Sequence, residues 1–279
     1  MKNYLVISNI EKDIDCKVGD MICKYLEKNG CTCSCASVTF DNIHKDRLGK
    51  YADKGAECVI VLGGDGTLIQ VAGALSGKDI PLLGINLGTL GYLAEVERDQ
   101  LVPTLDRLMA DKYDIEERMM LSAETGGIRQ DALNDIVIAR YGDLRVIRYR
   151  VFVNGRCLAA YEADGIIVST PTGSTGYNLS AGGPIVEPSA SIILMTPICP
   201  HTLNTRAVVL SAEDEIRIEV CEGKYSHEYE ACVSCDGAAA INLSVGDVVD
   251  IRKAAGVTKV IKMSREGFLE VLGRKLRAM

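Results

Sequence analysis

The stretch Val59-Ile60-Val61-Leu62-Gly63-Gly64-Asp65-Gly66-Thr67-Leu68 decides the fold. Its four consecutive apolar residues, 59–62, predict a strand buried on both faces of a parallel sheet. Glycines follow at once, and the apolar residues after them predict a helix. Backbone N–H groups at such a turn can face a phosphate, and the glycines let a ligand approach the backbone closely. Asp65 is an anion in this turn, so we expect it to accept a hydroxyl proton or to bind a metal.

Strand and helix patterns alternate along the first 113 residues. The first predicted helix ends at Asn29-Gly30, a pair typical of a helix C-terminus. A second glycine-rich stretch, residues 86–92, follows the fourth predicted strand. This alternation predicts a doubly wound α/β domain with its ligand at the carboxyl ends of the strands. We expect strands at residues 4–8, 31–38, 57–62 and 80–85, and helices at 11–29, within 41–54, from 68 to about 76 and at 99–111.

Beyond residue 113 the pattern changes to short alternating stretches, which predict an antiparallel, sandwich-like β domain. Residues 264–276 have helical spacing again, and we expect this last segment to return to the first domain. The expected domains are 1–113 (α/β), 114–257 (β-rich) and the returning segment 258–279. The expected strands cover residues 114–124, 132–139, 146–153, 157–161, 191–196, 207–210, 216–220, 229–235 and 248–253.

Length and composition exclude several classes of protein. The 279 residues are 47% hydrophobic and 25% charged, enough for two domains with real cores. The net charge of −7 disfavours a nucleic-acid partner. No apolar run has the length of a signal peptide or a membrane span, so we expect a cytoplasmic protein without a membrane partner. Eleven cysteines suit a reducing compartment, and the spacing of Cys31, Cys33 and Cys35 is not that of a zinc site.

A second unusual segment, residues 164–185, combines six Ser or Thr residues and five glycines in 22 positions. Such a segment cannot form a core, but it offers hydroxyls and free N–H groups to the polar edges of a nucleotide. A long surface loop is the alternative. Asn134-Asp135 interrupts an apolar stretch, and its amide could recognise a purine edge. A turn or bulge is an equally good interpretation of this pair.

These motifs together resemble the ATP-NAD kinase family, bacterial type. The resemblance rests on Gly63–Thr67, Leu133-Asn134-Asp135 and above all the long motif Asp164–Tyr177. Residues 84–93 and 197–201 match further stretches of that family. The motifs follow the family order and extend over roughly residues 58–240.

The resemblance implies phosphorylation of the adenosine 2′-hydroxyl of NAD to give NADP. The phosphoryl donor would be ATP or polyphosphate, with Mg²⁺ or another divalent cation accompanying ATP. It also implies an α/β domain with a β-rich NAD-binding domain, in a homodimer or homotetramer. No metal ligand is assigned to the protein itself.

The resemblance also implies roles for single residues. Asp65 becomes the catalytic proton acceptor, and Gly66 approaches NAD closely. Asn134 and Asp135 contact the adenosine part, and Asp164 lies near the nicotinamide end. The full set of implied binding residues is Asp65, Gly66, Tyr92 (near adenine), Asn134, Asp135, Arg145, Asp164, Thr172, Thr175, Gly176, Tyr177, Asn178, Leu179 and Ser180.

Several positions depart from the family pattern and leave fewer cations near the expected phosphates. Arg145 and Arg148 are candidates to compensate. Two alternatives stay open: a diacylglycerol- or sphingosine-type lipid kinase that shares the glycine turn, and a non-catalytic dinucleotide sensor. The departures are Asp135 for glutamate, Gly176 for alanine, Glu162, Gln70 and Gly73 for basic residues, and Ala238 for an amide.

Overall fold

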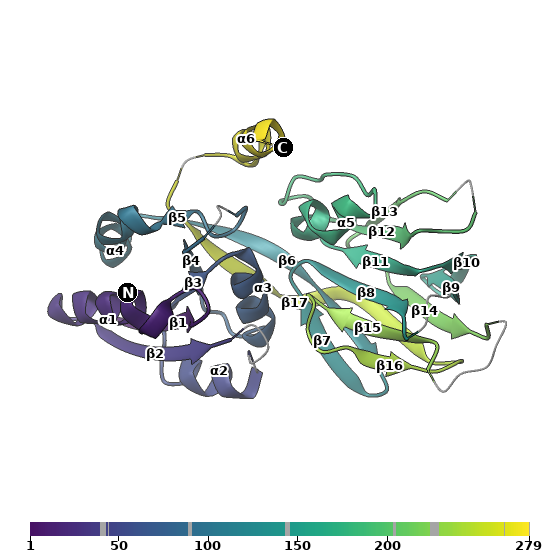
Figure 1. Cartoon of the computed structure of the whole chain (residues 1–279), viewed down its shortest axis with the longest axis horizontal. Coiled ribbons are helices and arrows are strands. Elements are labelled where there is room, and N and C mark those ends of the chain that lie inside the picture. The colour runs from purple at the N-terminus through teal and green to yellow at the C-terminus, as the bar shows by residue number, and fades with distance from the viewer. Residues whose placement is uncertain are drawn as a thin grey trace. The chain divides into compact units, whose positions relative to one another are not determined.

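The computed structural model describes residues 1–39, 43, 45–88, 91–142, 146–202, 205–223, 229–264 and 266–278. The chain divides into two compact units. The first, here the α/β unit, comprises residues 1–118 and 257–279, and the second, the β unit, comprises residues 119–256 (Figure 1). Two strands, β6 (Asp114–Thr125) and β17 (Val248–Lys262), cross the unit boundaries along the chain. The expected combination of an α/β domain with an antiparallel β domain is confirmed.

The α/β unit is built on a parallel sheet with the order β17-β4-β3-β1-β2. All six residues of β3 are buried, because helices cover both faces of such a sheet. On the first helix, Val18, Ile22 and Leu26 recur at helical spacing and are buried in the core. The elements are β1 (Asn3–Asn9), α1 (Lys17–Lys28), β2 (Thr32–Val38), α2 (Lys45–Ala52), β3 (Cys58–Gly63), α3 (Asp65–Ala74), β4 (Leu82–Asn86), β5 (Val96–Glu97), α4 (Leu101–Met109) and α6 (Phe268–Ala278).

The first helix was predicted to begin at residue 11, and this start is wrong. Residues Asp15 and Cys16 have φ of 58° and 53°, which breaks the helix before Lys17. The buried Asp13 carboxylate accepts the N–H groups of Val18 and Gly19, both at 2.9 Å. The helix therefore begins where these N–H groups find an acceptor.

The C-terminal part of the chain completes the α/β unit. Strand β17 pairs with β4 through Val260 and Leu82, and α6 follows it. The Glu95 carboxylate accepts the N–H groups of Met263 at 2.5 Å and Ser264 at 3.0 Å. Glu95 also forms an ion pair with Lys262, and both side chains are mostly buried. The expected return of the last segment to the first domain follows from these contacts.

The β unit consists of two sheets that share one core, which confirms the sandwich. Its core takes Ile136 and Ile166 from one sheet and Val151 and Ile218 from the other. One sheet has the order β13-β12-β11-β8-β15-β16, and the other contains β10-β9-β14-β17 with β6 and β7. The strands are β7 (Ile128–Ala132), β8 (Asp135–Arg140), β9 (Ile147–Val153), β10 (Arg156–Ala163), β11 (Gly165–Ser169), β12 (Ile192–Ile198), β13 (Val208–Ser211), β14 (Ile216–Cys221), β15 (Ala231–Cys235) and β16 (Ile241–Leu243).

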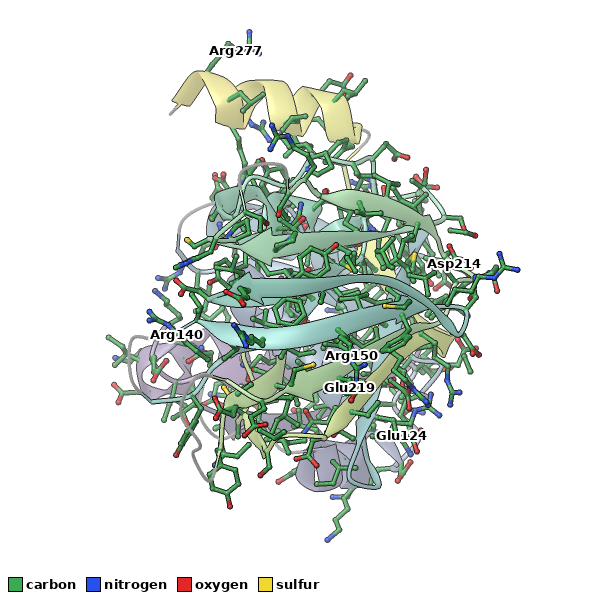
Figure 2. The ribbon with its side chains drawn as sticks, turned by 90° about the vertical axis from the view of Figure 1, so that its right-hand side faces the viewer. Glu124, Arg140, Arg150, Asp214, Glu219 and Arg277 are labelled. Carbon is green, nitrogen blue, oxygen red and sulfur yellow. The ribbon has the colours of Figure 1, made fainter. Side chains whose placement is uncertain are left out.

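The outer surface of the β unit carries ion pairs between neighbouring strands. Arg150 on β9 and Glu219 on β14 face one another in register and form a pair at 2.7 Å (Figure 2). Such exposed pairs contribute little to stability, so the shared core holds the sandwich together. Three of its strands, β7, β11 and β16, are absent from the strands expected from the sequence. No helix among the described residues is long and apolar enough to cross a membrane.

Candidate active site

The turn between β3 and α3 is fixed by contacts from two other strand ends. A Cβ atom on Gly63 would lie 2.5 Å from Thr67 Oγ1, so only glycine fits at this position. Thr67 in turn accepts a hydrogen bond from the Asn9 side chain at 3.0 Å. The carbonyl of Gly63 accepts the N–H of Leu87 at 2.9 Å. The ends of β1 and β4 therefore hold Asp65, the first residue of α3, in place.

Three consecutive backbone N–H groups bind the Asp65 carboxylate. Tyr92 donates at 2.5 Å, Leu93 at 3.1 Å and Ala94 at 2.9 Å. A Cβ atom on Gly91 would lie 1.8 Å from the same carboxylate, so the loop can close only with glycine there. A carboxylate has about four acceptor positions, so Asp65 can accept one further donor such as a ligand hydroxyl. The three hydrogen bonds fix the orientation of the Asp65 carboxylate and leave one acceptor position for a ligand.

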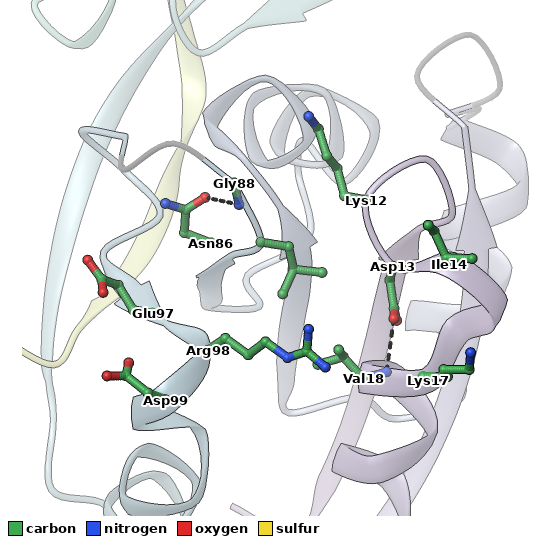
Figure 3. A pocket seen from close by; sticks show the side chains of 11 residues that line it. Lys12, Asp13, Ile14, Lys17, Val18, Asn86, Gly88, Glu97, Arg98 and Asp99 are labelled. Atoms are coloured by element: carbon green, nitrogen blue, oxygen red, sulfur yellow. Dashed lines mark hydrogen bonds between the residues drawn. The ribbon is translucent and has the colours of Figure 1, made fainter.

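A cavity of about 640 Å³ lies at the carboxyl ends of β1 and β4 in the α/β unit (Figure 3). The Arg98 side chain extends into it, and the carboxylates of Glu97 and Asp99 point away from its guanidinium. Lys17, a third cation at the cavity, pairs with Asp15 at 3.2 Å, whereas neither Lys12 nor Arg98 forms an ion pair with another residue that the structure describes. Asp13 also lines the cavity, but its carboxylate is engaged at the start of α1. The cavity thus presents two available cations.

Lys12 and Arg98 were not predicted from the sequence. Lys12 follows the end of β1 by three positions, and Arg98 directly follows β5. The position of Lys12 shortly after a predicted strand was the available signal, because ligands bind at that edge of an α/β sheet. Arg98 had no such signal, since β5 was not predicted. The cavity also contains Asn86, whose side chain accepts the Gly88 N–H at 2.9 Å (Figure 3).

Two other predicted residues of the α/β unit flank Asp65. Gly66 follows it and is exposed. The Tyr92 ring contacts the Lys275 ammonium, which lies 4.1 Å from the ring centroid. Partial burial, with a smaller effect of the Asp65 charge, raises the pKa of Tyr92. The Tyr92 ring therefore connects the Asp65 loop to helix α6.

In the β unit, a second carboxylate also binds three consecutive N–H groups. Asp236 accepts from Leu133 at 2.6 Å, Asn134 at 2.8 Å and Asp135 at 3.0 Å. Asp236 has φ of 51°, which turns its side chain back on this segment. Burial raises the pKa of Asp236 to about 7, although the three N–H donors lower it. Burial also raises the pKa of Asp135 to about 6.

The loop after β11 packs against Asn134 and Asp135. The Thr170 N–H donates to the Asn134 carbonyl at 2.8 Å, and a Cβ atom on Gly173 would lie 2.3 Å from that oxygen. A Cβ on Gly176 would lie 3.5 Å from Asn134 Nδ2 and 4.0 Å from Asp135 Oδ2. The structure thus brings Gly176 next to Asn134 and Asp135, from which it is distant in sequence.

Two buried oxygen atoms in this cluster lack a partner among the described residues. They are Asn134 Oδ1 and Thr172 Oγ1. Buried polar atoms are nearly always hydrogen-bonded, so such atoms point to a ligand or an ordered water. Both atoms belong to residues that were predicted from the sequence to bind a nucleotide.

The remaining predicted residues of the β unit have different surroundings. Asn178 is fully buried, donates to the carbonyls of Ser174 and Pro184 and accepts from Thr196, so its amide builds the loop. Tyr177 and Ser180 are exposed, and Thr175 and Leu179 are half-buried. Arg145 lies outside the described residues.

Asp164 is not part of the Asn134 cluster. It precedes β11, whereas Thr170 follows it, so five strand residues, about 17 Å at 3.3 Å each, separate the two ends. Asp164 forms an ion pair with Arg140 at 3.9 Å. Among the described residues, no group of three or more His, Cys, Asp or Glu side chains could hold a metal ion.

The titration of Asp236 predicts a pH-dependent stability. The folded protein keeps this proton up to about pH 7, whereas the unfolded chain loses it near pH 4. The folded state therefore binds more protons between these values, and the free energy of unfolding should fall as pH rises through this range. In Asp236→Asn this contribution is absent, so the stability difference between wild type and variant should shrink from pH 5 to pH 8. Urea unfolding at several pH values measures the free energy of unfolding of both proteins. A difference that stays constant with pH would contradict the prediction.

Comparison with known proteins identifies the family. Residues 5–113 match the model of the ATP-NAD kinase N-terminal domain, and residues 133–263 match that of the C-terminal domain. The NAD kinase of Agathobacter rectalis is 45% identical over 279 residues, covering 99% of both chains. The NAD kinase of Caldanaerobacter subterraneus subsp. tengcongensis is 38% identical and also covers 99% of both chains.

Two solved structures share the fold. Yeast NADH kinase complexed with NADH has a TM-score of 0.87 at 21% identity, covering 99% of this chain and 88% of that one. The NAD kinase from Archaeoglobus fulgidus in complex with ATP has a TM-score of 0.79 at 24% identity and covers 99% of both chains. These matches favour neither the lipid-kinase nor the sensor alternative. The chain belongs to the ATP-NAD kinase family.

Proposed function

We propose that this protein transfers the terminal phosphoryl group of ATP to the adenosine 2′-hydroxyl of NAD, giving NADP. The observation that carries the proposal is the Asp65 carboxylate, which three N–H groups orient while one acceptor position remains. Membership of the ATP-NAD kinase family supports the choice of NAD and ATP.

Asp65 acts on the attacking hydroxyl. A ribose hydroxyl is a weak nucleophile at neutral pH and must be placed in line with the phosphorus atom. It donates a hydrogen bond to the open acceptor position of Asp65, which directs an oxygen lone pair toward the phosphoryl group. As the new P–O bond forms and ADP leaves, the proton passes to the carboxylate. Proton acceptance of this kind contributes about 10²–10⁴-fold to the rate.

The cavity at the ends of β1 and β4 binds the phosphates of ATP. Lys12 and Arg98 supply positive charge there, and the neighbouring Leu87 is hydrogen-bonded to Gly63, next to the Asp65 turn. The divalent cation enters with ATP as part of the substrate. It neutralises charge on the triphosphate.

The Asn134 cluster of the β unit binds the adenosine half of NAD. An asparagine amide can pair with an adenine edge through one donor and one acceptor. The unpartnered Asn134 Oδ1 and Thr172 Oγ1 are suited to such a ligand. We also propose NAD contacts for Thr175, Tyr177, Leu179 and Ser180 in the loop after β11, for Gly66 and Tyr92, and for Asp164 at the nicotinamide end.

We also propose that the protein forms a homodimer or homotetramer. Asp164 lies at the opposite end of β11 from the Asn134 cluster, so it suits the far end of a dinucleotide bound by the same or a neighbouring copy. We also propose a cytoplasmic location, supported by eleven cysteines that are all free. We also propose polyphosphate as an alternative donor, because the cations of the cavity would bind phosphate groups and not adenine.

A product assay tests the function and the role of Asp65. Purified protein with NAD, ATP and Mg²⁺ should form NADP, and Asp65→Asn should lower kcat by about 10²-fold or more. Gly91→Ala should lower it similarly, because the new Cβ would occupy the position of the Asp65 carboxylate. Gly49→Ala in helix α2 is the matched control and should keep full activity, since a Cβ there meets no atom within 4 Å. Retained NAD binding without NADP from any donor would instead favour the sensor.

The role of the cavity predicts a selective defect in ATP binding. Arg98→Ala should raise the KM for ATP about tenfold, the loss expected for one charge-assisted hydrogen bond. The KM for NAD should change little. Lys24→Ala, which removes an exposed cation from α1, is the control. Initial rates at varied ATP and NAD measure both constants, and an equal effect on the two would argue against a phosphate site here.

A further inference from the structure

Three thiols meet between helix α1 and strand β2 in the α/β unit. Cys33 and Cys35 are two positions apart on β2, so both side chains lie on the same face of the strand. Cys23 faces them from α1, and its sulfur accepts a hydrogen bond from the Cys33 thiol at 2.7 Å. Cys23 also hydrogen-bonds with Cys35. The candidate active site uses none of the three.

The Cys23 and Cys33 sulfurs are close to bonding distance. A disulfide has an S–S length of about 2.05 Å, so the two atoms need to approach by only about 0.7 Å. Both residues are partly exposed, which admits a small oxidant. The other cysteines differ: Cys58 is fully buried, and the exposed Cys157 contacts no thiol among the described residues.

We propose that Cys23 and Cys33 form an intramolecular disulfide when the protein meets a low-molecular-weight disulfide. One thiolate attacks the oxidant, whose S–S bond breaks to give a mixed disulfide and one free thiol. The second cysteine then loses its proton and attacks the protein sulfur of the mixed disulfide, displacing the second thiol. Two protein thiols are oxidised to one disulfide, and the oxidant is reduced to two thiols.

The cross-link would tie α1 to an edge of the sheet. Strand β2 pairs only with β1, so its other edge has no partner strand among the described residues. The Cys23–Cys33 bond closes a short loop through the connection after α1 and restrains the unfolded chain. Oxidation should therefore raise the melting temperature of the α/β unit by several degrees.

The third thiol stays reduced in this proposal. A Cβ atom on Gly19 would lie 3.6 Å from Cys35 Sγ, which places Cys35 beside the first turns of α1. The sulfur atoms of Cys23 and Cys33 lie 2.7 Å apart. The attacking species is a thiolate, whose fraction rises with pH, so oxidation should proceed faster at pH 8.5 than at pH 7.

Peptide mapping of the full-length protein tests the proposal. The protein is treated with oxidised glutathione at pH 8.5, alkylated and digested with trypsin without reduction. Trypsin cuts after Lys24 and Lys28, so Cys23 and Cys33 fall in separate peptides. We expect one linked peptide pair, two hydrogen atoms lighter than the sum of its parts, with fragmentation that places the bond at Cys33. Reduction should release the pair and reverse the rise in melting temperature.

Matched cysteine-to-serine variants make the result decisive. Cys33→Ser should abolish the linked pair, whereas Cys35→Ser and the control Cys157→Ser should retain it. Three outcomes would overturn the proposal: a bond from Cys23 to Cys35, stable glutathione adducts on Cys23 or Cys33, or unmodified thiols after treatment. Because the readout is covalent, it does not depend on the kinase activity.

Discussion

The structure depends on a carboxylate that accepts the N–H groups of consecutive backbone residues. Asp65 does this with residues 92–94 and Asp236 with residues 133–135. Each loop segment has N–H groups that would otherwise lack a partner in regular secondary structure. The carboxylate satisfies them together and so gives an irregular segment one defined conformation.

Each of these carboxylates lies beside residues with a proposed chemical role. Asp65 is itself the proposed proton acceptor, and Asp236 shapes the segment that carries Asn134 and Asp135. Hydrogen bonds to charged groups are stronger than those between neutral groups, so the Asp65 carboxylate holds its loop more firmly than an ordinary turn is held. Glu95 uses the same chemistry with Met263 and Ser264. Preorganised loops cost a ligand less ordering entropy on binding.

The sequence predicted the α/β unit well, because a buried parallel strand such as β3 is a continuous apolar run. The start of α1 was missed because Asp15 and Cys16 adopt positive φ, which their residue types do not predict. Asp65 and Asn134 stood out by their motifs. The hydrogen bonds that hold them could not be predicted, since Tyr92–Ala94 and Asp236 reach them through contacts between distant parts of the chain. Arg98 was missed because a single surface cation has no pattern.

The pairing of β17 with β4 has a consequence for the order of folding during synthesis. The strand that completes the α/β sheet is made after the β unit, whereas β1–β4 are made before it. Until then β4 lacks one neighbour and Glu95 lacks Lys262, Met263 and Ser264. The α/β unit therefore remains incomplete while the β unit is made. An exposed strand edge in a nascent chain is a site for mispairing and chaperone binding.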